Sequence, residues 1–210
     1  MSDLQRKRIR LPQPYYMGFG PYFVTICTKD RKRLFTIPGV VESLIAALRQ
    51  QSGRFAFEVH AYCFMPDHCH LLLAGKTAQA NLSEMIRRFK GCGAKSIRQF
   101  GIFDAWQKGY YEHILRSGED CASAVAYIFE NPVRAGLAKD IYTWPFSGSF
   151  VLEWRQFQPP VAKFVPPYKA SEGRDGRNGG EELPPRENLR RTDNPRRRPK
   201  AAPTSGTLYN

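Results

Sequence analysis

The residues that could do chemistry begin with two histidines separated by one residue. His68 and His70 open a strand-like apolar stretch that follows the turn-forming pair Pro66-Asp67. Because side chains two apart in a strand point to the same face, the two imidazoles project together. The opposite face of the strand carries Cys69, Leu71 and Leu73. We expect these three side chains to point into the core and the two histidines to point outward. Two neutral imidazoles can chelate a divalent metal ion that polarises a phosphate, although a packed or surface pair is the alternative that spacing leaves open.

A possible nucleophile lies on a predicted helix that runs from Asp120 to Glu130. Helical residues four apart share a face, so Tyr127 and Asn131 are placed together. A phenol can attack a phosphodiester and leave a covalent phosphotyrosine, and the amide oxygen of Asn131 can serve as a metal ligand. Most helical tyrosines serve packing, however, and spacing alone does not single out Tyr127 among the ten tyrosines of the chain.

Basic side chains are candidates for holding a nucleic acid. The chain carries a formal net charge of +13, and residues 1–155 alone carry 21 Lys or Arg against 13 Asp or Glu. This balance favours a polyanionic partner, most simply DNA or RNA. The candidate phosphate contacts come from a predicted helix over 82–100 and from the loop after the first strand: Arg87, Arg88, Lys90, Lys95, Arg98, Lys29, Arg31, Lys32 and Arg33. For the helical group, a solvated helix face is the alternative.

The elements that must position these residues form a mixed pattern. Segments 22–27, 55–64, 68–73 and 112–115 are rich in β-branched and aromatic residues and are expected to be strands. Helical periodicity covers 40–50, 82–100 and 120–130, where Pro132 is expected to end the third helix. The order strand, helix, strand, strand, helix, strand, helix predicts an α+β domain with a central antiparallel sheet in a ferredoxin-like arrangement.

Composition divides the chain into three regions. Residues 1–17 form a basic N-terminal arm, and residues 18–155 form the expected folded domain. Residues 156–210 are rich in Pro, Gly and Arg, and they are predicted to be a disordered basic tail because they cannot bury enough apolar surface to fold. Five scattered cysteines fit a reducing compartment. Without a signal peptide or an apolar run long enough to span a membrane, we expect a cytoplasmic protein with no membrane partner.

Four segments, taken in order, resemble the REP-associated tyrosine transposases, relatives of the insertion-sequence transposases in the HUH nuclease superfamily. The segments are 65–73 (MPDHCHLLL), 106–116 (WQKGYYEHILR), 127–137 (YIFENPVRAGL) and 144–149 (WPFSGS). The resemblance covers residues 18–150 and is specific because four motifs keep their order and spacing. Between the two histidines the family usually has a bulky hydrophobe, whereas this sequence has Cys69, a smaller one.

The resemblance implies an HUH domain and a metal-dependent, transposase-type endonuclease for single-stranded DNA. It implies that Tyr127 is the nucleophile and that a 5′-phosphotyrosine intermediate allows the cleaved DNA to be rejoined. The same resemblance implies that Mg²⁺ or Mn²⁺ is held by His68, His70 and Asn131. The DNA partner would form hairpins, as REP-like palindromes do, and a monomer with Tyr127 acting in cis is expected rather than a dimer.

Several alternatives stay open. A non-enzymatic nucleic-acid-binding protein on a ferredoxin-like sheet would explain the charge and the aromatic residues, but not the histidines. A zinc-dependent hydrolase that activates water would form no covalent protein–DNA species. Tyr110 and Tyr111 compete with Tyr127 as the nucleophile. Asp67 could tune the metal ion or the attacking phenol, or simply form the turn.

Overall fold

A five-stranded antiparallel sheet forms the centre of the computed structural model, which describes residues 13–115, 120–160 and 164–166. The strands are β1 (Pro21–Cys27), β2 (Phe57–Met65), β3 (His68–Gly75), β4 (Tyr111–Ile114) and β5 (Ser147–Gly148). Their order is β4-β1-β3-β2-β5, and each neighbouring pair is antiparallel. All described residues belong to one compact unit.

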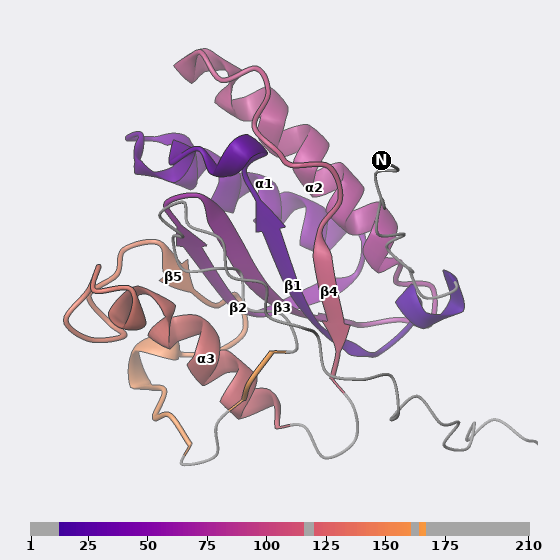
Figure 1. Ribbon diagram of the computed structural model, residues 1–210. Helices are drawn as coiled ribbons and strands as arrows, with labels where there is room; N and C mark the ends of the chain where they lie inside the picture. Colours follow the sequence, from indigo (N-terminus) through magenta and orange to yellow (C-terminus); the bar gives the residue numbers. More distant parts are fainter. Residues whose placement is uncertain (1–12, 116–119, 161–163, 167–210) are drawn as a thin grey trace, which may run out of the picture. The chain divides into compact units, whose positions relative to one another are not determined.

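Helices cover both faces of this sheet (Figure 1). Helices α1 (Val40–Arg54) and α2 (Leu82–Ser96) pack on one face, and α3 (Cys121–Arg134) packs on the other. The predicted α+β fold with a central antiparallel sheet is confirmed, and the first four strands have the order of a ferredoxin-like sheet. The short edge strand β5 was not predicted, because two residues carry no readable alternation.

Strand β3 is buried on both faces, which explains its nearly continuous apolar sequence. Cys69, Leu71 and Leu73 belong to the core under α1 and α2, as predicted, whereas Leu72 belongs to a second core under α3. The expectation that the histidines point outward is wrong. They share the face of Leu72, on which α3 packs, and both are buried: His70, beside Tyr127 of α3, is only 2% exposed and His68 9%.

The third helix begins where predicted but ends later. The carboxylate of Asp120 accepts hydrogen bonds from the backbone N–H groups of Ala122 and Ser123 and so caps the first turn. The prediction that Pro132 ends this helix is wrong, because α3 continues to Arg134. Proline removes a single backbone donor, and the last turn still closes through the bond from the Ala135 N–H to the Asn131 carbonyl.

Packing on the α3 side extends beyond residue 155. Phe164 is buried in the second core, and Phe157 packs against it. The other parts of the predicted tail, 161–163 and 167–210, lie outside the described residues, as does most of the predicted arm. Within the described ranges, no helix combines the length and the apolar character needed to span a membrane.

Candidate active site

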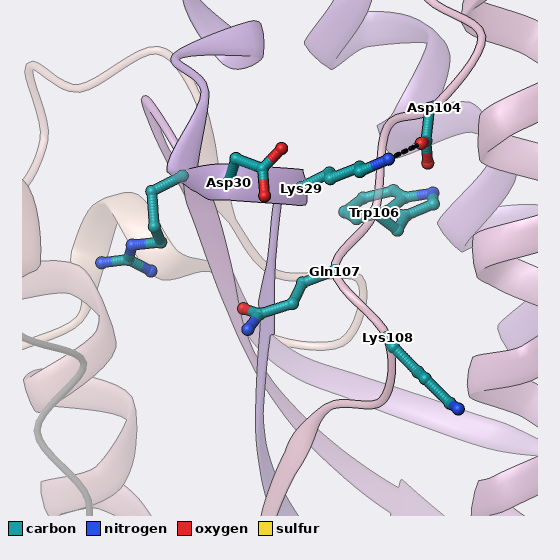
Figure 2. A pocket seen from close by; sticks show the side chains of 7 residues that line it. Lys29, Asp30, Asp104, Trp106, Gln107 and Lys108 are labelled. Atoms are coloured by element: carbon teal, nitrogen blue, oxygen red, sulfur yellow. Dashed lines mark hydrogen bonds and ion pairs between the residues drawn. The ribbon is translucent and has the colours of Figure 1, made fainter. Parts of the chain in front are cut away.

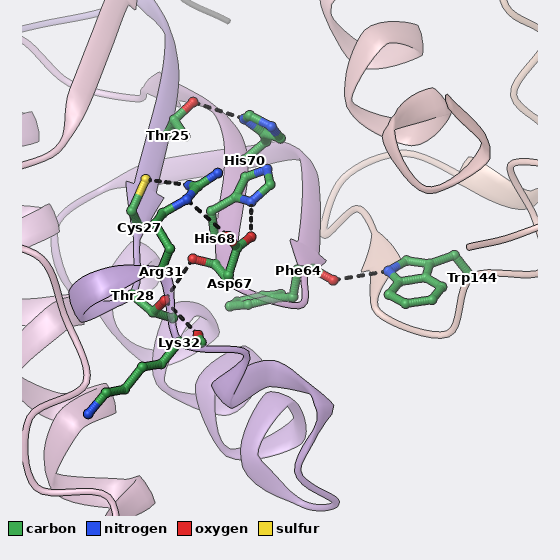
Figure 3. A network of polar contacts seen from close by, with 10 residues as sticks. All are labelled: Thr25, Cys27, Thr28, Arg31, Lys32, Phe64, Asp67, His68, His70 and Trp144. Atoms are coloured by element: carbon green, nitrogen blue, oxygen red, sulfur yellow. Dashed lines mark hydrogen bonds and ion pairs between the residues drawn. The ribbon is translucent and has the colours of Figure 1, made fainter. Parts of the chain in front are cut away.

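The two histidines stand side by side on β3, with ring centroids 4.8 Å apart and ring planes at 83°. Each ring is held through its Nδ1 atom (Figure 3). The Nδ1 of His70 lies 2.9 Å from the hydroxyl of Thr25, its cross-strand partner on β1, and the Nδ1 of His68 lies 2.6 Å from a carboxylate oxygen of Asp67. With both Nδ1 atoms engaged, Nε2 is the nitrogen that each ring can offer to a metal ion.

The surroundings of His70 favour its neutral form. Burial is the main cause that holds the pKa of His70 well below its usual value, and electrostatic interactions with His68, Arg134 and Arg31 lower it further. A neutral imidazole keeps the lone pair with which it binds a metal ion. His70 is therefore in the protonation state of a ligand at neutral pH.

Asp67 connects His68 to the end of β1. Its second carboxylate oxygen lies 2.9 Å from Nε of Arg31, whose Nη1 donates to the sulfur of Cys27 at 3.0 Å. Burial opposes ionisation of Asp67, but the hydrogen bond and charge of His68 and the charge of Arg31 lower its pKa overall. Asp67 is thus an ionised acceptor that fixes both His68 and Arg31, a role beyond that of a turn residue.

Tyr127 lies beside this pair within the same chain. Its ring centroid is 6.0 Å from that of His70, and Phe23 and Phe164 contact the ring at 5.7 and 5.9 Å, all in edge-to-face geometry. The phenol is half-buried, between α3 and the sheet. The fold therefore brings His70, and with it the neighbouring His68, close to the tyrosine that the family resemblance selected.

Asn131 lies one helical turn after Tyr127. Its Nδ2 donates to the backbone carbonyl of Tyr127 at 2.9 Å, which leaves its Oδ1 as the acceptor end of the amide. Among the described residues, no group of three His, Cys, Asp or Glu side chains could hold a metal ion. The assignment of Asn131 as a third metal ligand stays a prediction.

The two rival tyrosines occupy different faces of the sheet. Tyr110 packs on the side of α1 and α2, and its hydroxyl donates to Ser83 at 3.3 Å. Tyr111 is the cross-strand partner of Thr25 and packs against the second core, so it shares a face with His70. Of these two rivals, only Tyr111 lies on the face of the histidines.

The cations predicted on the second helix lie away from the histidines. Helix α2 packs on the opposite face of the sheet, where Arg87 and Arg88 both pair with Glu84. Lys90 donates to the carbonyls of Gln107 and Gly109, at 2.7 Å each. Lys95 and Arg98 are exposed. The structure therefore separates this predicted phosphate track from the candidate active site.

The cations predicted after the first strand lie closer to the histidines. Lys29 and Arg31 line a pocket of about 420 Å³ that also includes Trp106, Gln107 and Lys108. Figure 2 shows Lys29 directed toward Asp104, with which it forms an ion pair, and Gln107 and Lys108 along the neighbouring segment. Lys32 and Arg33 are exposed in the same loop. Arg31 joins this pocket to Asp67 and so to His68.

Two residues at the site were not singled out from the sequence. Thr25 orients His70, and the guanidinium of Arg134 lies 4.2 Å from the ring centroid of Tyr127. The alternation of β1 could have placed Thr25 on the face of Phe23, but not its partner on another strand. Arg134 was missed because the helix was expected to end before it.

Comparison with known proteins gives one consistent family. A family model described as IS200-like transposase matches residues 21–131, more than half of the chain. A relative from Haemophilus influenzae, described as a REP-associated tyrosine transposase, is 31% identical over 142 residues, which cover 61% of this chain and 78% of the relative. The REP-associated tyrosine transposase of Escherichia coli is 27% identical over 153 residues, covering 67% and 87%.

A solved structure of a REP-associated tyrosine transposase bound to a REP hairpin is similar in fold. Its TM-score is 0.55 at 27% sequence identity, over 70% of this chain and 82% of that chain. The family match at residues 21–131 includes both histidines, Tyr127 and Asn131.

Proposed function

This chain belongs to the family of IS200-like transposases, and from that premise we propose that it cleaves and rejoins single-stranded DNA at hairpin-forming, REP-like palindromes. The observation that carries the proposal is the position of the Tyr127 ring, 6.0 Å from that of His70 in the same chain. A structurally similar protein bound to a REP hairpin supports hairpin DNA as the ligand. The net charge of +13 supports a polyanionic partner.

In the proposed reaction, Tyr127 attacks the scissile phosphorus. The phenol gives its proton to water, its oxygen bonds to phosphorus, and the bond from phosphorus to the 3′ oxygen breaks. The 3′ oxygen takes up a proton and leaves as a free 3′-OH, while the 5′ end stays on the enzyme as a phosphotyrosine. Attack of a 3′-OH on this ester reverses the step and rejoins DNA without an external energy source.

The residues around the histidines fit a divalent cation, Mg²⁺ or Mn²⁺. The Nε2 atoms of His68 and His70 and the Oδ1 of Asn131 would hold it. When bound, the ion neutralises charge that develops on the phosphate oxygens. The chain itself contributes the orientation of the ligands, through Thr25 on His70 and Asp67 on His68.

The role of Tyr127 is tested with the full-length Tyr127→Phe variant. Incubated with labelled single-stranded hairpin DNA and Mn²⁺, the wild type should form a covalent protein–DNA adduct, and the variant should form none. Tyr111→Phe is the matched control, because Tyr111 shares the sheet face with His70 and should keep full adduct formation. Persistent adduct in Tyr127→Phe would overturn the proposal.

The role of the histidines is tested by separating cleavage from binding. His68→Ala and His70→Ala should both lose cleavage but keep their affinity for hairpin DNA, measured by fluorescence anisotropy without metal. An equal loss of affinity would instead indicate a structural pair. DNA binding without any metal-dependent cleavage by the wild type would favour the alternative, a non-enzymatic nucleic-acid-binding protein.

A further inference from the structure

The residue at the end of α3 makes an unusual set of contacts with the candidate nucleophile. The guanidinium carbon of Arg134 lies 4.2 Å from the centroid of the Tyr127 ring. Its Nη2 donates to the backbone carbonyl of Tyr127 at 3.1 Å, and its Nη1 donates to the carboxylate of Glu130 at 3.2 Å. One side chain thus contacts both the ring and the main chain of the same tyrosine.

We propose that Arg134 is a positioning residue that holds the ring of Tyr127 in the orientation facing the histidines. The inference rests on the proposed function of Tyr127 as the nucleophile. It adds the residue that orients the Tyr127 ring for the attack on phosphorus. The guanidinium lies over a face of the ring, and three neighbouring aromatic rings stand nearly perpendicular to it.

The geometry around the ring supports this role. Phe23, His70 and Phe164 all meet the Tyr127 ring edge-to-face, at interplanar angles of 70°, 75° and 79°. A cation placed over the face of an aromatic ring is attracted by its negative π surface. Arg134 therefore favours the orientation of the Tyr127 ring in which its guanidinium lies over the ring face.

Arg134 is itself well fixed. Its planar guanidinium is held at the same time by the Glu130 carboxylate, the Tyr127 carbonyl and the Tyr127 ring, although its side chain is 33% exposed. A planar guanidinium loses less freedom per contact than a flexible ammonium would. The position also suits a cation, since it is the last residue of α3, where the helix dipole is negative.

The course of α3 through Pro132 makes these contacts possible. Arg134 lies seven positions after Tyr127, and the side chains of a helix lean toward its N-terminus. Because α3 remains helical to Arg134, the arginine side chain can reach back along the helix to Tyr127. The left-handed Gly136, with φ of 68°, then ends the helix directly beyond.

The positive charge of Arg134 affects the pKa of two buried side chains near the site. Burial dominates the low pKa of His70, and Arg134 is one of the positive charges that lower it further. Burial also raises the pKa of the neighbouring Cys63 to about 12, and the charge of Arg134 acts against that shift. A direct bond from Arg134 to a DNA phosphate would be a different role, and binding measurements distinguish the two.

The first test measures the chemical step separately from binding in Arg134→Ala and Arg134→Lys. With saturating hairpin DNA and Mn²⁺, we expect Arg134→Ala to form the adduct about 10- to 100-fold more slowly, because a small displacement of the attacking oxygen slows the reaction strongly. Its DNA affinity should stay unchanged, and Arg134→Lys should recover part of the rate. Arg155→Ala is the matched control, since Arg155 lies over Trp154 at 5.1 Å and should leave the rate unchanged.

Three outcomes would overturn the inference. They are an unchanged rate with unchanged DNA affinity in Arg134→Ala, an unchanged rate with weakened DNA affinity in that variant, or an equal slowing in Arg155→Ala. If the wild type forms no adduct, the proposed function fails. If the wild type is active and the Arg134 variants are equally fast, only the positioning role of Arg134 fails.

A second test follows the ring itself and does not depend on activity. In protein labelled at its tyrosine rings, the Tyr127 signals are assigned by comparison with Tyr127→Phe, and the ring-flip rate is measured by NMR. Arg134→Ala should flip this ring faster than the wild type, and Arg155→Ala should not. An unchanged flip rate in Arg134→Ala would contradict a positioning role.

Discussion

A histidine offers one ring nitrogen to a metal ion, so the partner of the other nitrogen decides how the ring is presented. Thr25 and Asp67 take this role for His70 and His68 through the two Nδ1 contacts. Asp67 is the stronger partner, because it is ionised and is itself held by Arg31. The His-x-His spacing provides two candidate ligands, and Thr25 and Asp67 orient their rings.

Removing the carboxylate of Asp67 should weaken metal binding more than it weakens the fold. We expect Asp67→Ala to lower the affinity for Mn²⁺ about 10- to 100-fold, as is usual for partners of metal-bound histidines. The free Mn²⁺ signal in electron paramagnetic resonance measures this directly. Asp104→Ala removes the same charge from the ion pair with Lys29 and should keep wild-type affinity. Equal affinities in the two variants would count against the role given to Asp67.

At the scale of elements, α3 carries the predicted nucleophile, and its N-terminal cap is titratable. Hydrogen bonds from the Ala122 N–H, the Ser123 hydroxyl and the Ser123 N–H lower the pKa of Asp120 from its ordinary value of 3.8. A depressed carboxylate pKa contributes stability above the unfolded value, and this contribution is lost as the pH falls through the folded value. The stabilisation by Asp120 is therefore complete at neutral pH and disappears in acid.

Replacing Asp120 should reveal this dependence. At pH 7 we expect Asp120→Ala to melt about 2–4 °C below the wild type, as lost caps usually do in domains of this size. The difference should shrink as the pH falls below 3.8. Asp120→Asn keeps a capping oxygen that does not titrate, so its melting temperature should stay above that of Asp120→Ala by the same amount as the pH falls. A gap for Asp120→Ala that stays constant to pH 3 would contradict this account.

The helices and most strands could be predicted from the sequence because their apolar patterns are local. The two-residue β5 has no such pattern. Pro132 suggested the end of α3, but the helix continues to Arg134 because its last turn still closes. The face shared by His68 and His70 followed from strand geometry. The burial of this face under α3 could not be predicted, because it depends on which helix packs there. The contact between Arg134 and Tyr127 depends on the same packing.

At the scale of the whole molecule, the sheet separates two differently built sides. The basic residues predicted on the second helix lie on the side of the sheet that α1 and α2 cover. The histidines, Tyr127 and Arg134 lie on the side of α3. The pocket with Lys29 and Arg31 adjoins the histidines through Asp67. A role of the α2 cations in DNA binding would therefore act at a distance from the scissile phosphate.

The presence of His70 and Tyr127 in one chain, with ring centroids 6.0 Å apart, predicts that one copy suffices for cleavage. Mixing Tyr127→Phe with a His68→Ala, His70→Ala double variant should then restore no adduct, because neither chain has a complete site. If a second copy supplied the tyrosine, about half of the dimers in an equal mixture would pair the two variants. Each such dimer would contain one intact site, and adduct would appear on the histidine-deficient chain. A size tag on one variant identifies the labelled chain by gel electrophoresis. Adduct formation at a level between the single variants and the wild type would overturn the cis arrangement, whereas an inactive mixture at every protein concentration supports it.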